Sequence, residues 1–173
     1  MYNEQQRRFV LIYYPFAKKV QERVGISCVF LLAQCALETG WGSTIVGNMM
    51  FGVKDTDGIN GNEQLITTTE YHSTDTVKYP TILWIKKIKD KLFKYRIKDW
   101  FRKYNTPEDS FFDHSQFFFK NKRYKTALTV KDDYVAFARE VAKAGYATDP
   151  TYADKLISIG KVIQQIIIDH KLN

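Results

Sequence analysis

Helical spacing of apolar residues marks the first part of the chain. Residues 3–14 and 16–24 each gather their apolar side chains on one face, with Pro15 at a break or at a first helical position and Gly25 as a stop. We therefore expect two consecutive helical stretches before the first glycine.

The next segment, residues 28–39, is apolar on nearly every side, which predicts a central buried helix. Ser27 is placed to cap its start and Gly40 to end it. Its two cysteines, Cys28 and Cys35, would lie about 10 Å apart along the helix axis, whereas a disulfide needs Cα atoms roughly 4.4 to 6.8 Å apart. We expect two buried, unpaired thiols, as is typical of folding in a reducing compartment.

A strand-like pattern replaces the helical one in the middle of the chain. Frequent glycines give residues 41–61 the character of a loop. Residues 65–71, 76–88 and 92–104 then alternate polar or basic side chains with apolar or aromatic ones. This alternation predicts a three-stranded antiparallel sheet.

Helical patterning returns in the last third. Thr106 and Pro107, with two acidic residues after them, form a strong helix start, and the pattern predicts that this helix runs to about residue 119. Further helices are expected over residues 133–144 and 151–170. The apolar face of the last helix is expected to consist of Ala153, Leu156, Ile157, Gly160, Ile163 and Ile167.

These elements predict an α+β fold. Because no repeat, low-complexity tract or linker interrupts the pattern, we expect a single domain over residues 1–173, with a β-lobe at about 62–104. A helical body beside a small sheet leaves a cleft between the two as the natural binding site. No apolar run reaches the ~20 residues of a membrane span, and we expect a soluble monomer.

Positive charge is concentrated in one part of the chain. The net charge is +7, and residues 86–103 hold nine Lys or Arg against two Asp. This excess favours an acidic partner, whether an anionic cell wall, an anionic membrane or nucleic acid. Because Phe93, Tyr95, Trp100 and Phe101 interleave with the basic residues, single-stranded nucleic-acid binding is one alternative function. We prefer a basic lobe that holds an anionic wall and expect no nucleic-acid partner.

Glu38 is the first candidate for chemistry. A carboxylate in the last helical turn meets the negative end of the helix dipole, and its neighbours in sequence are apolar. Both effects favour the protonated form and raise the pKa, which is how a carboxylic acid becomes a proton donor near neutral pH. The competing interpretation is a solvated surface carboxylate without function.

Glu70 is a candidate for a second carboxylate, the usual complement in glycoside hydrolysis. Strand alternation places Thr68, Glu70 and His72 on one face of the predicted sheet, which could equally be a solvated face. Metal ligation finds no support, because the three histidines are scattered and no cysteine has a histidine partner at ligand spacing. No phosphate-cradling motif is present either, so no metal, nucleotide or other cofactor is expected.

Five sequence blocks together resemble those of a known family. The blocks are LLAQCALETGWG, NMMFGVK, TTTEY, FKNKRYKTAL and AGYATDPTYADKL, in this order. They resemble the cell-wall N-acetylglucosaminidases of glycoside hydrolase family 73, over about residues 9–163. The resemblance implies a lysozyme-like helical body with a β-lobe flanking the active-site cleft, and hydrolysis of the β-1,4 bond after N-acetylglucosamine in peptidoglycan glycan strands.

The resemblance also assigns roles to individual residues. Glu38 matches the family's catalytic acid, Glu70 a β-lobe carboxylate proposed as base or water activator, and Tyr146 a tyrosine required near the reacting sugar. The residues implied in substrate contact are Trp41, Asn48, Phe51, Tyr124 and Tyr152. A shorter loop at residues 42–48 and a longer, more basic hairpin than is usual in the family imply an altered preference for glycan length or cross-links.

Several alternatives stay open at this stage. The reaction can proceed with inversion, Glu70 activating water, or with retention through the sugar's own acetamido group. A non-catalytic glycan-binding or assembly module and a muramidase are the other functions to weigh. We see no signal peptide and expect delivery to the wall by cell lysis, a phage particle or a specialised export route, from either a phage or a bacterial source.

Overall fold

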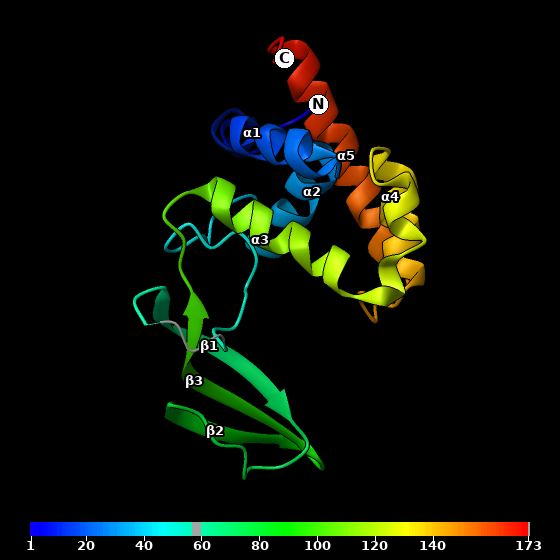
Figure 1. Cartoon of the computed structure of the whole chain (residues 1–173). Helices are drawn as coiled ribbons and strands as arrows, with labels where there is room; N and C mark the ends of the chain where they lie inside the picture. Colours follow the sequence, from blue (N-terminus) through cyan, green and yellow to red (C-terminus); the bar gives the residue numbers. More distant parts are fainter. Residues whose placement is uncertain (57–59, 173) are drawn as a thin grey trace. The chain divides into compact units, whose positions relative to one another are not determined.

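The helices and strands follow each other in the predicted order in a computed structural model, which describes residues 1–56 and 60–172 (Figure 1). The chain divides into two compact units. The helical unit comprises Met1–Phe51 and Tyr104–Asn173, and the sheet unit comprises Gly52–Lys103.

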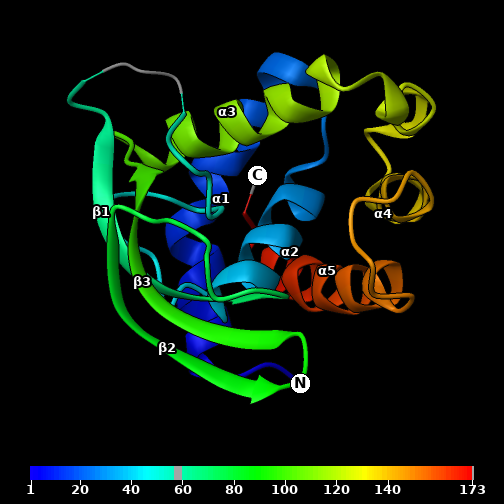
Figure 2. The same ribbon diagram turned by 90° about the horizontal axis from the view of Figure 1, so that it is seen from below.

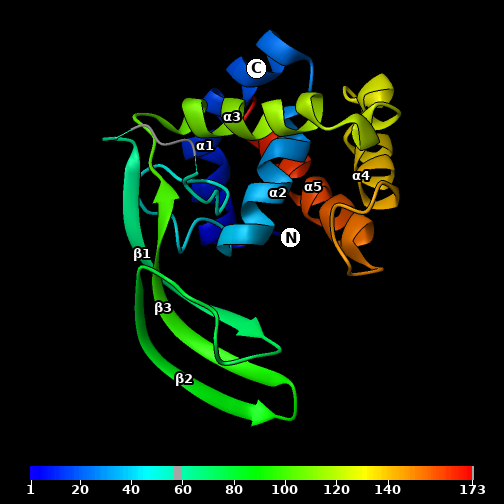
Figure 3. The same cartoon turned by 60° about the horizontal axis from the view of Figure 1, so that its bottom comes forward.

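The helical unit is built around one apolar helix. Its elements are α1 (Glu4–Val24), α2 (Cys28–Thr39), α3 (Pro107–Lys120), the short 3₁₀ helices η1 (Lys122–Tyr124) and η2 (Ala127–Val130), α4 (Tyr134–Lys143) and α5 (Tyr152–Asp169). Ten of the twelve residues of α2 are buried, and α2 packs against α1, α4 and α5. Figure 3 shows α2 enclosed by its neighbours. The all-round apolar pattern of α2 therefore reflects its central position, as predicted.

The beginning of the chain differs from prediction at Pro15. A single helix, α1, continues through this residue. Proline removes one intrahelical hydrogen bond, but Pro15 is exposed and water can satisfy the freed carbonyl. Buried residues on both sides, including Phe9, Tyr14 and Val20, hold the two halves of the helix in line.

Two further predictions about helix details are wrong. The side chain of Ser27 makes no cap hydrogen bond; instead the Cys28 amide donates to Gln21 Oε1 at 2.7 Å. On α5 the buried face includes Ile166 rather than Ile167, because packing against α2 and α4 selects the side of the helix that faces them. Predicted stops are confirmed at Gly25 and Gly40, which both adopt left-handed conformations.

The sheet unit contains three antiparallel strands, β1 (Glu63–His72), β2 (Thr81–Lys89) and β3 (Leu92–Arg102). Their order is β1-β3-β2, so β3 lies in the middle, as Figure 2 shows. Tyr95 and Ile97 of β3 are fully buried, and Phe101 is nearly so. Their side chains share one face, since residues two apart point the same way on a strand.

The α+β class and the three-stranded antiparallel sheet are thus confirmed. Cys28 and Cys35 are both buried and free, as predicted. Burial raises the pKa of Cys35 to about 12, so this thiol stays protonated and unreactive. Over the described residues, no helix is long and apolar enough to cross a membrane.

Candidate active site

Glu38 lies in the last turn of α2, where the helix ends in a tight left-handed turn. Its side chain is exposed on one side, while the surrounding protein removes part of its water and thereby raises its pKa. The carboxylate also meets the negative end of the α2 dipole. This environment matches the one predicted from the sequence for a proton donor.

The turn after Glu38 is unusual because three successive residues adopt left-handed backbone conformations. The φ angles are 56° at Gly40, 57° at Trp41 and 85° at Gly42. Such a conformation is uncommon for a residue with a bulky side chain and is maintained here by the neighbouring structure. The Gly42 amide donates to Thr39 Oγ1 at 2.9 Å, and Gln5 Nε2 donates to the Gly40 carbonyl at 2.9 Å. The turn is therefore tied to both α1 and α2.

Trp41 forms part of a groove of about 370 Å³ beside this turn. Its ring packs edge-on against Phe9 at 5.6 Å between centroids, and Phe9 in turn contacts Tyr13. The remaining lining residues are Glu4, Gln5, Arg8, Ile12, Gly42 and Ser43. Trp41 therefore offers a half-exposed aromatic ring three residues after Glu38.

A buried hydrogen-bonded chain runs beneath the candidate acid. Gln34, one turn before Glu38 on α2, donates from Nε2 to the Tyr152 hydroxyl at 2.7 Å. Its Oε1 lies 2.8 Å from His114 Nε2. Burial lowers the pKa of His114 to about 3, so the ring is neutral. Because an amide oxygen can only accept, Nε2 of His114 carries the proton.

Tyr146 follows the left-handed Gly145 after α4 and lies among other aromatic rings. Its ring stacks on Tyr152 with centroids 5.4 Å apart. Desolvation raises the pKa of Tyr146, and the Glu38 charge raises it further. Desolvation also raises the pKa of Tyr152, while the hydrogen bond from Gln34 lowers it; the charges of Tyr146 and, to a smaller extent, Glu38 raise it further. The structure therefore brings Glu38, Tyr146 and Tyr152 into one electrostatic environment.

Four other predicted site residues have clear structural positions in the helical unit. Phe51 is 4% exposed and stacks on His114 with centroids 3.7 Å apart. Tyr124 is fully buried and Tyr152 is 5% exposed. Asn48 donates from Nδ2 to the carbonyls of Tyr104 and Asn105, so it connects two segments distant in sequence. The three aromatic side chains are therefore packed inside the helical unit in this structure.

Glu70 belongs to the sheet unit, on β1 opposite Tyr95 of β3. Lys54 Nζ lies 3.4 Å from Glu70 Oε1 and 2.6 Å from Asp99 Oδ2, so one ammonium bridges two carboxylates. Lys54 also lies over the Phe101 ring at 4.3 Å. Glu70 is about one-third exposed, and it is held by these contacts rather than free in solvent.

Four residues of these arrangements were not predicted as site residues. Gln34 was visible only as the polar interruption of an apolar helix, and His114 only as an isolated histidine. Lys54 and Asp99 carried no distinguishing pattern. No group of His, Cys, Asp or Glu that could hold a metal ion occurs over residues 1–56 and 60–172.

Comparison with known proteins places this geometry in a family. The family model described as mannosyl-glycoprotein endo-beta-N-acetylglucosaminidase matches residues 14–165. The peptidoglycan hydrolase FlgJ of Vibrio parahaemolyticus is 35% identical over 158 residues, which cover 88% of this chain and 46% of that protein. The exo-glucosaminidase LytG of Bacillus subtilis is 29% identical over 164 residues, covering 90% and 51% respectively. The chain thus spans about half the length of these relatives.

Solved structures agree with the sequence relatives. The glycoside hydrolase domain of Salmonella typhimurium FlgJ superposes with a TM-score of 0.70 at 28% identity, covering 96% of this chain and 91% of that one. A peptidoglycan hydrolase mutant from Sphingomonas sp. A1 gives 0.66 at 27% identity, covering 95% and 99%. The predicted resemblance is confirmed: the chain belongs to the glucosaminidase family of glycoside hydrolases, family 73.

Proposed function

We propose that this protein hydrolyses peptidoglycan, cleaving the β-1,4 bond after N-acetylglucosamine, with Glu38 as the general acid. Membership in the glucosaminidase family supports the reaction class. The names of the relatives, peptidoglycan hydrolase and exo-glucosaminidase, support the polymer and the sugar. The observation that carries the assignment of the acid is the raised pKa of Glu38 at the end of α2.

In the proposed reaction, Glu38 gives its proton to the glycosidic oxygen as the bond to the anomeric carbon breaks. Tyr146 acts beside it. Its raised pKa keeps the hydroxyl protonated, so that it can donate a hydrogen bond to the substrate near the reacting sugar. The chain from His114 through Gln34 to Tyr152 holds the ring on which Tyr146 stacks. Trp41 contributes an aromatic surface for a neighbouring sugar.

The second carboxylate in the proposal is Glu70. It takes a proton from the water that attacks the anomeric carbon, which inverts the configuration at that carbon. Lys54 supports this role, because its ammonium contacts Glu70 and Asp99 and restricts the carboxylate to few orientations. In the alternative route the substrate's acetamido group attacks first, the configuration is retained, and Glu70 has a supporting role.

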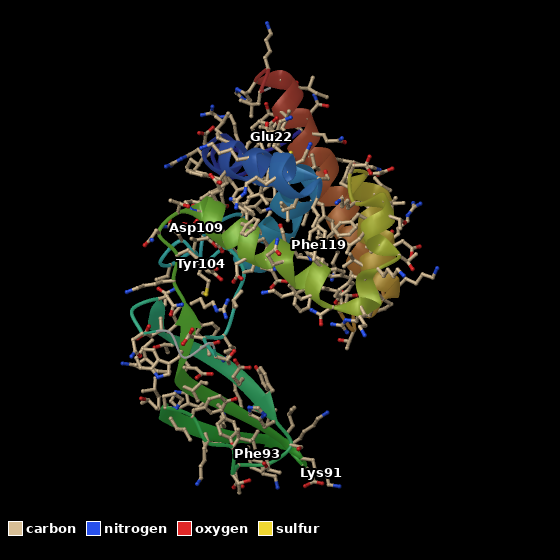
Figure 4. All side chains as sticks on the ribbon, in the orientation of Figure 1. Glu22, Lys91, Phe93, Tyr104, Asp109 and Phe119 are labelled. Carbon is tan, nitrogen blue, oxygen red and sulfur yellow. The ribbon has the colours of Figure 1, made fainter. Side chains whose placement is uncertain are left out.

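Mass spectrometry of peptidoglycan digested by the purified protein tests the proposed function. We expect soluble fragments with N-acetylglucosamine at the reducing end. Fragments that end in N-acetylmuramic acid would assign a muramidase instead, and intact glycan strands would exclude hydrolysis. Glu38→Gln should release almost no fragments, whereas the matched control Glu22→Gln, an exposed residue of α1 labelled in Figure 4, should act like the native protein.

The stereochemical course separates the two routes. Proton NMR of the first products distinguishes an inverted from a retained anomer. An inverted product together with a large loss of rate in Glu70→Gln supports the proposed base. A retained product excludes direct attack by the water that Glu70 would activate.

A further inference from the structure

The hairpin formed by β2, its turn and most of β3, residues 81–98, is strongly basic; we name it the basic hairpin. It contains seven cationic side chains and one carboxylate, Asp90. The cations are Lys86, Lys87, Lys89, Lys91, Lys94, Arg96 and Lys98. Asp90 pairs with Lys87 at 3.8 Å between exposed groups, and such a pair contributes little in water. Most of the positive charge is therefore available to a partner.

Strand β2 also exposes large apolar side chains. Its residues from Ile82 to Lys89 are all exposed. The apolar ones, with their exposed fractions, are Ile82 (40%), Leu83 (48%), Trp84 (45%), Ile85 (37%) and Ile88 (47%). A single exposed apolar residue is ordinary, but five within seven positions of one strand are unusual. Because side chains alternate along a strand, they expose apolar surface on both faces of β2.

Strand pairing places Trp84 on the same face of the sheet as three of the cations. Lys86 lies directly opposite Lys94, and Trp84 lies opposite Arg96. Facing like charges destabilise a sheet. The arrangement of Lys86 and Lys94 is therefore unfavourable for the isolated fold and becomes favourable only when an anionic partner neutralises both.

The tip of the hairpin also carries cationic and aromatic side chains. Lys91 adopts a left-handed conformation, with φ of 51°, and Phe93 follows it on β3. Figure 4 shows the labelled side chains of Lys91 and Phe93 together at the end of the hairpin. Lys87 lies over the Phe93 ring at 5.9 Å. The turn end of the basic hairpin thus combines cationic side chains with an aromatic ring.

We propose that the basic hairpin binds the surface of an anionic lipid bilayer. The cations complement the negative headgroups, and each Lys or Arg near such a surface adds to the affinity. The exposed apolar residues of β2 would enter the boundary between headgroups and acyl chains, where tryptophan is favoured. A hydrated polyanion would neutralise the lysines but leave these apolar side chains in water. Six of the seven cations are lysines, whereas phosphate recognition in nucleic acids favours the planar arginine.

Vesicle binding by the full chain tests this proposal, which does not depend on the hydrolytic activity. We expect co-sedimentation with vesicles of phosphatidylglycerol and phosphatidylcholine, weakening as salt rises, and little with phosphatidylcholine alone. Lys86→Gln with Lys94→Gln should weaken binding about thirtyfold, since each cation contributes about fivefold. The matched control pairs Lys125→Gln with Lys161→Gln, two exposed lysines of the helical unit, and should bind like the native chain.

The apolar contribution needs its own measurement. In a chain carrying Trp41→Phe and Trp100→Phe, Trp84 is the one remaining tryptophan. Its fluorescence should shift to shorter wavelength on addition of anionic vesicles, because the indole leaves water. Ile82→Ser with Ile85→Ser should weaken binding at high salt, whereas Ile168→Ser, a residue 68% exposed on α5, should not.

Three results would overturn the lipid assignment. The first is equal binding to anionic and zwitterionic vesicles. The second is binding of a soluble phosphodiester polymer or single-stranded DNA as tightly as vesicles with the same dependence on Lys86 and Lys94. The third is self-association through β2, seen as a dimer by sedimentation that Ile82→Ser with Ile85→Ser abolishes, with no vesicle binding.

Discussion

Gln34 connects the candidate site to the core, and its replacement by leucine makes a quantitative test. Leucine is similar in volume but removes the acceptor for His114 and the donor to Tyr152. Gln34 is 1% exposed, His114 6% and Tyr152 5%, so water cannot replace the lost partner. Leaving a buried polar group unsatisfied costs about 1–3 kcal/mol. Two such groups predict a loss of about 2–6 kcal/mol in the free energy of unfolding.

The second variant, His114→Phe, removes the partner instead. A phenyl ring can keep the stacking on Phe51 and lacks the polar nitrogens. In the Gln34→Leu background this change removes an orphaned donor, so it should cost less than in the native chain. We expect a coupling free energy of about 1–3 kcal/mol between the two positions, within the range found for residues in contact.

Urea denaturation followed by circular dichroism measures this coupling. The four chains compared are the native protein, Gln34→Leu, His114→Phe and the double variant. Gln164→Leu, at an exposed position of α5, is the matched control and should change the free energy of unfolding by no more than about 0.5 kcal/mol. If the effects of Gln34→Leu and His114→Phe add to within about 0.5 kcal/mol, the buried hydrogen bond contributes nothing and the reasoning is refuted.

Three more predictions concern protonation and turnover. Glu38→Gln should lower wall hydrolysis at least about a hundredfold, as measured by an activity assay, and a near-active variant contradicts the assignment. Its free energy of unfolding at pH 7, measured by denaturation, should stay equal or rise by up to about 1 kcal/mol, because the change removes a carboxylate from the negative helix end. The lowered pKa of His114, about 3 against the usual 6.5, means that the unfolded chain binds one more proton between these pH values. The free energy of unfolding should therefore fall with falling pH by up to about 1.4 kcal/mol per unit, less steeply in His114→Phe; parallel curves would contradict this. Tyr146→Phe should reduce turnover about tenfold, as expected for one hydrogen bond, and a loss as large as that of Glu38→Gln would point to a chemical role instead.

Local sequence signals predicted the helices well because caps and stops act within a few residues. The predicted bounds of α2 match the structure, since an apolar run ending in Gly40 leaves few alternatives. The start of α3 is also correct: Thr106 and Asp109 satisfy each other's backbone amides in a capping box. The position of Glu38 in the last turn of α2 followed directly from these signals.

The start of β2 could not be predicted in the same way. The pattern extended the strand back to residue 76, whereas it begins at Thr81. The preceding segment is bound elsewhere, because the Tyr95 hydroxyl donates to the Thr74 carbonyl and accepts from the Val77 amide. A residue of β3 thus holds the segment before β2 through its side chain.

The residues of the candidate site show the same difference between local signals and tertiary packing. Sequence pattern and family resemblance predicted Glu38, Glu70 and Tyr146 as site residues, because each lies in a recognisable local block. Only tertiary packing brought Gln34 to Tyr152, 118 residues away, and to His114, 80 residues away. A polar residue in an apolar helix does not reveal its partner, since the partner depends on how distant helices pack. Burial removes water from His114 and keeps it neutral, which no local pattern encodes. It also produces the raised pKa of Glu38 that the apolar helix end predicted.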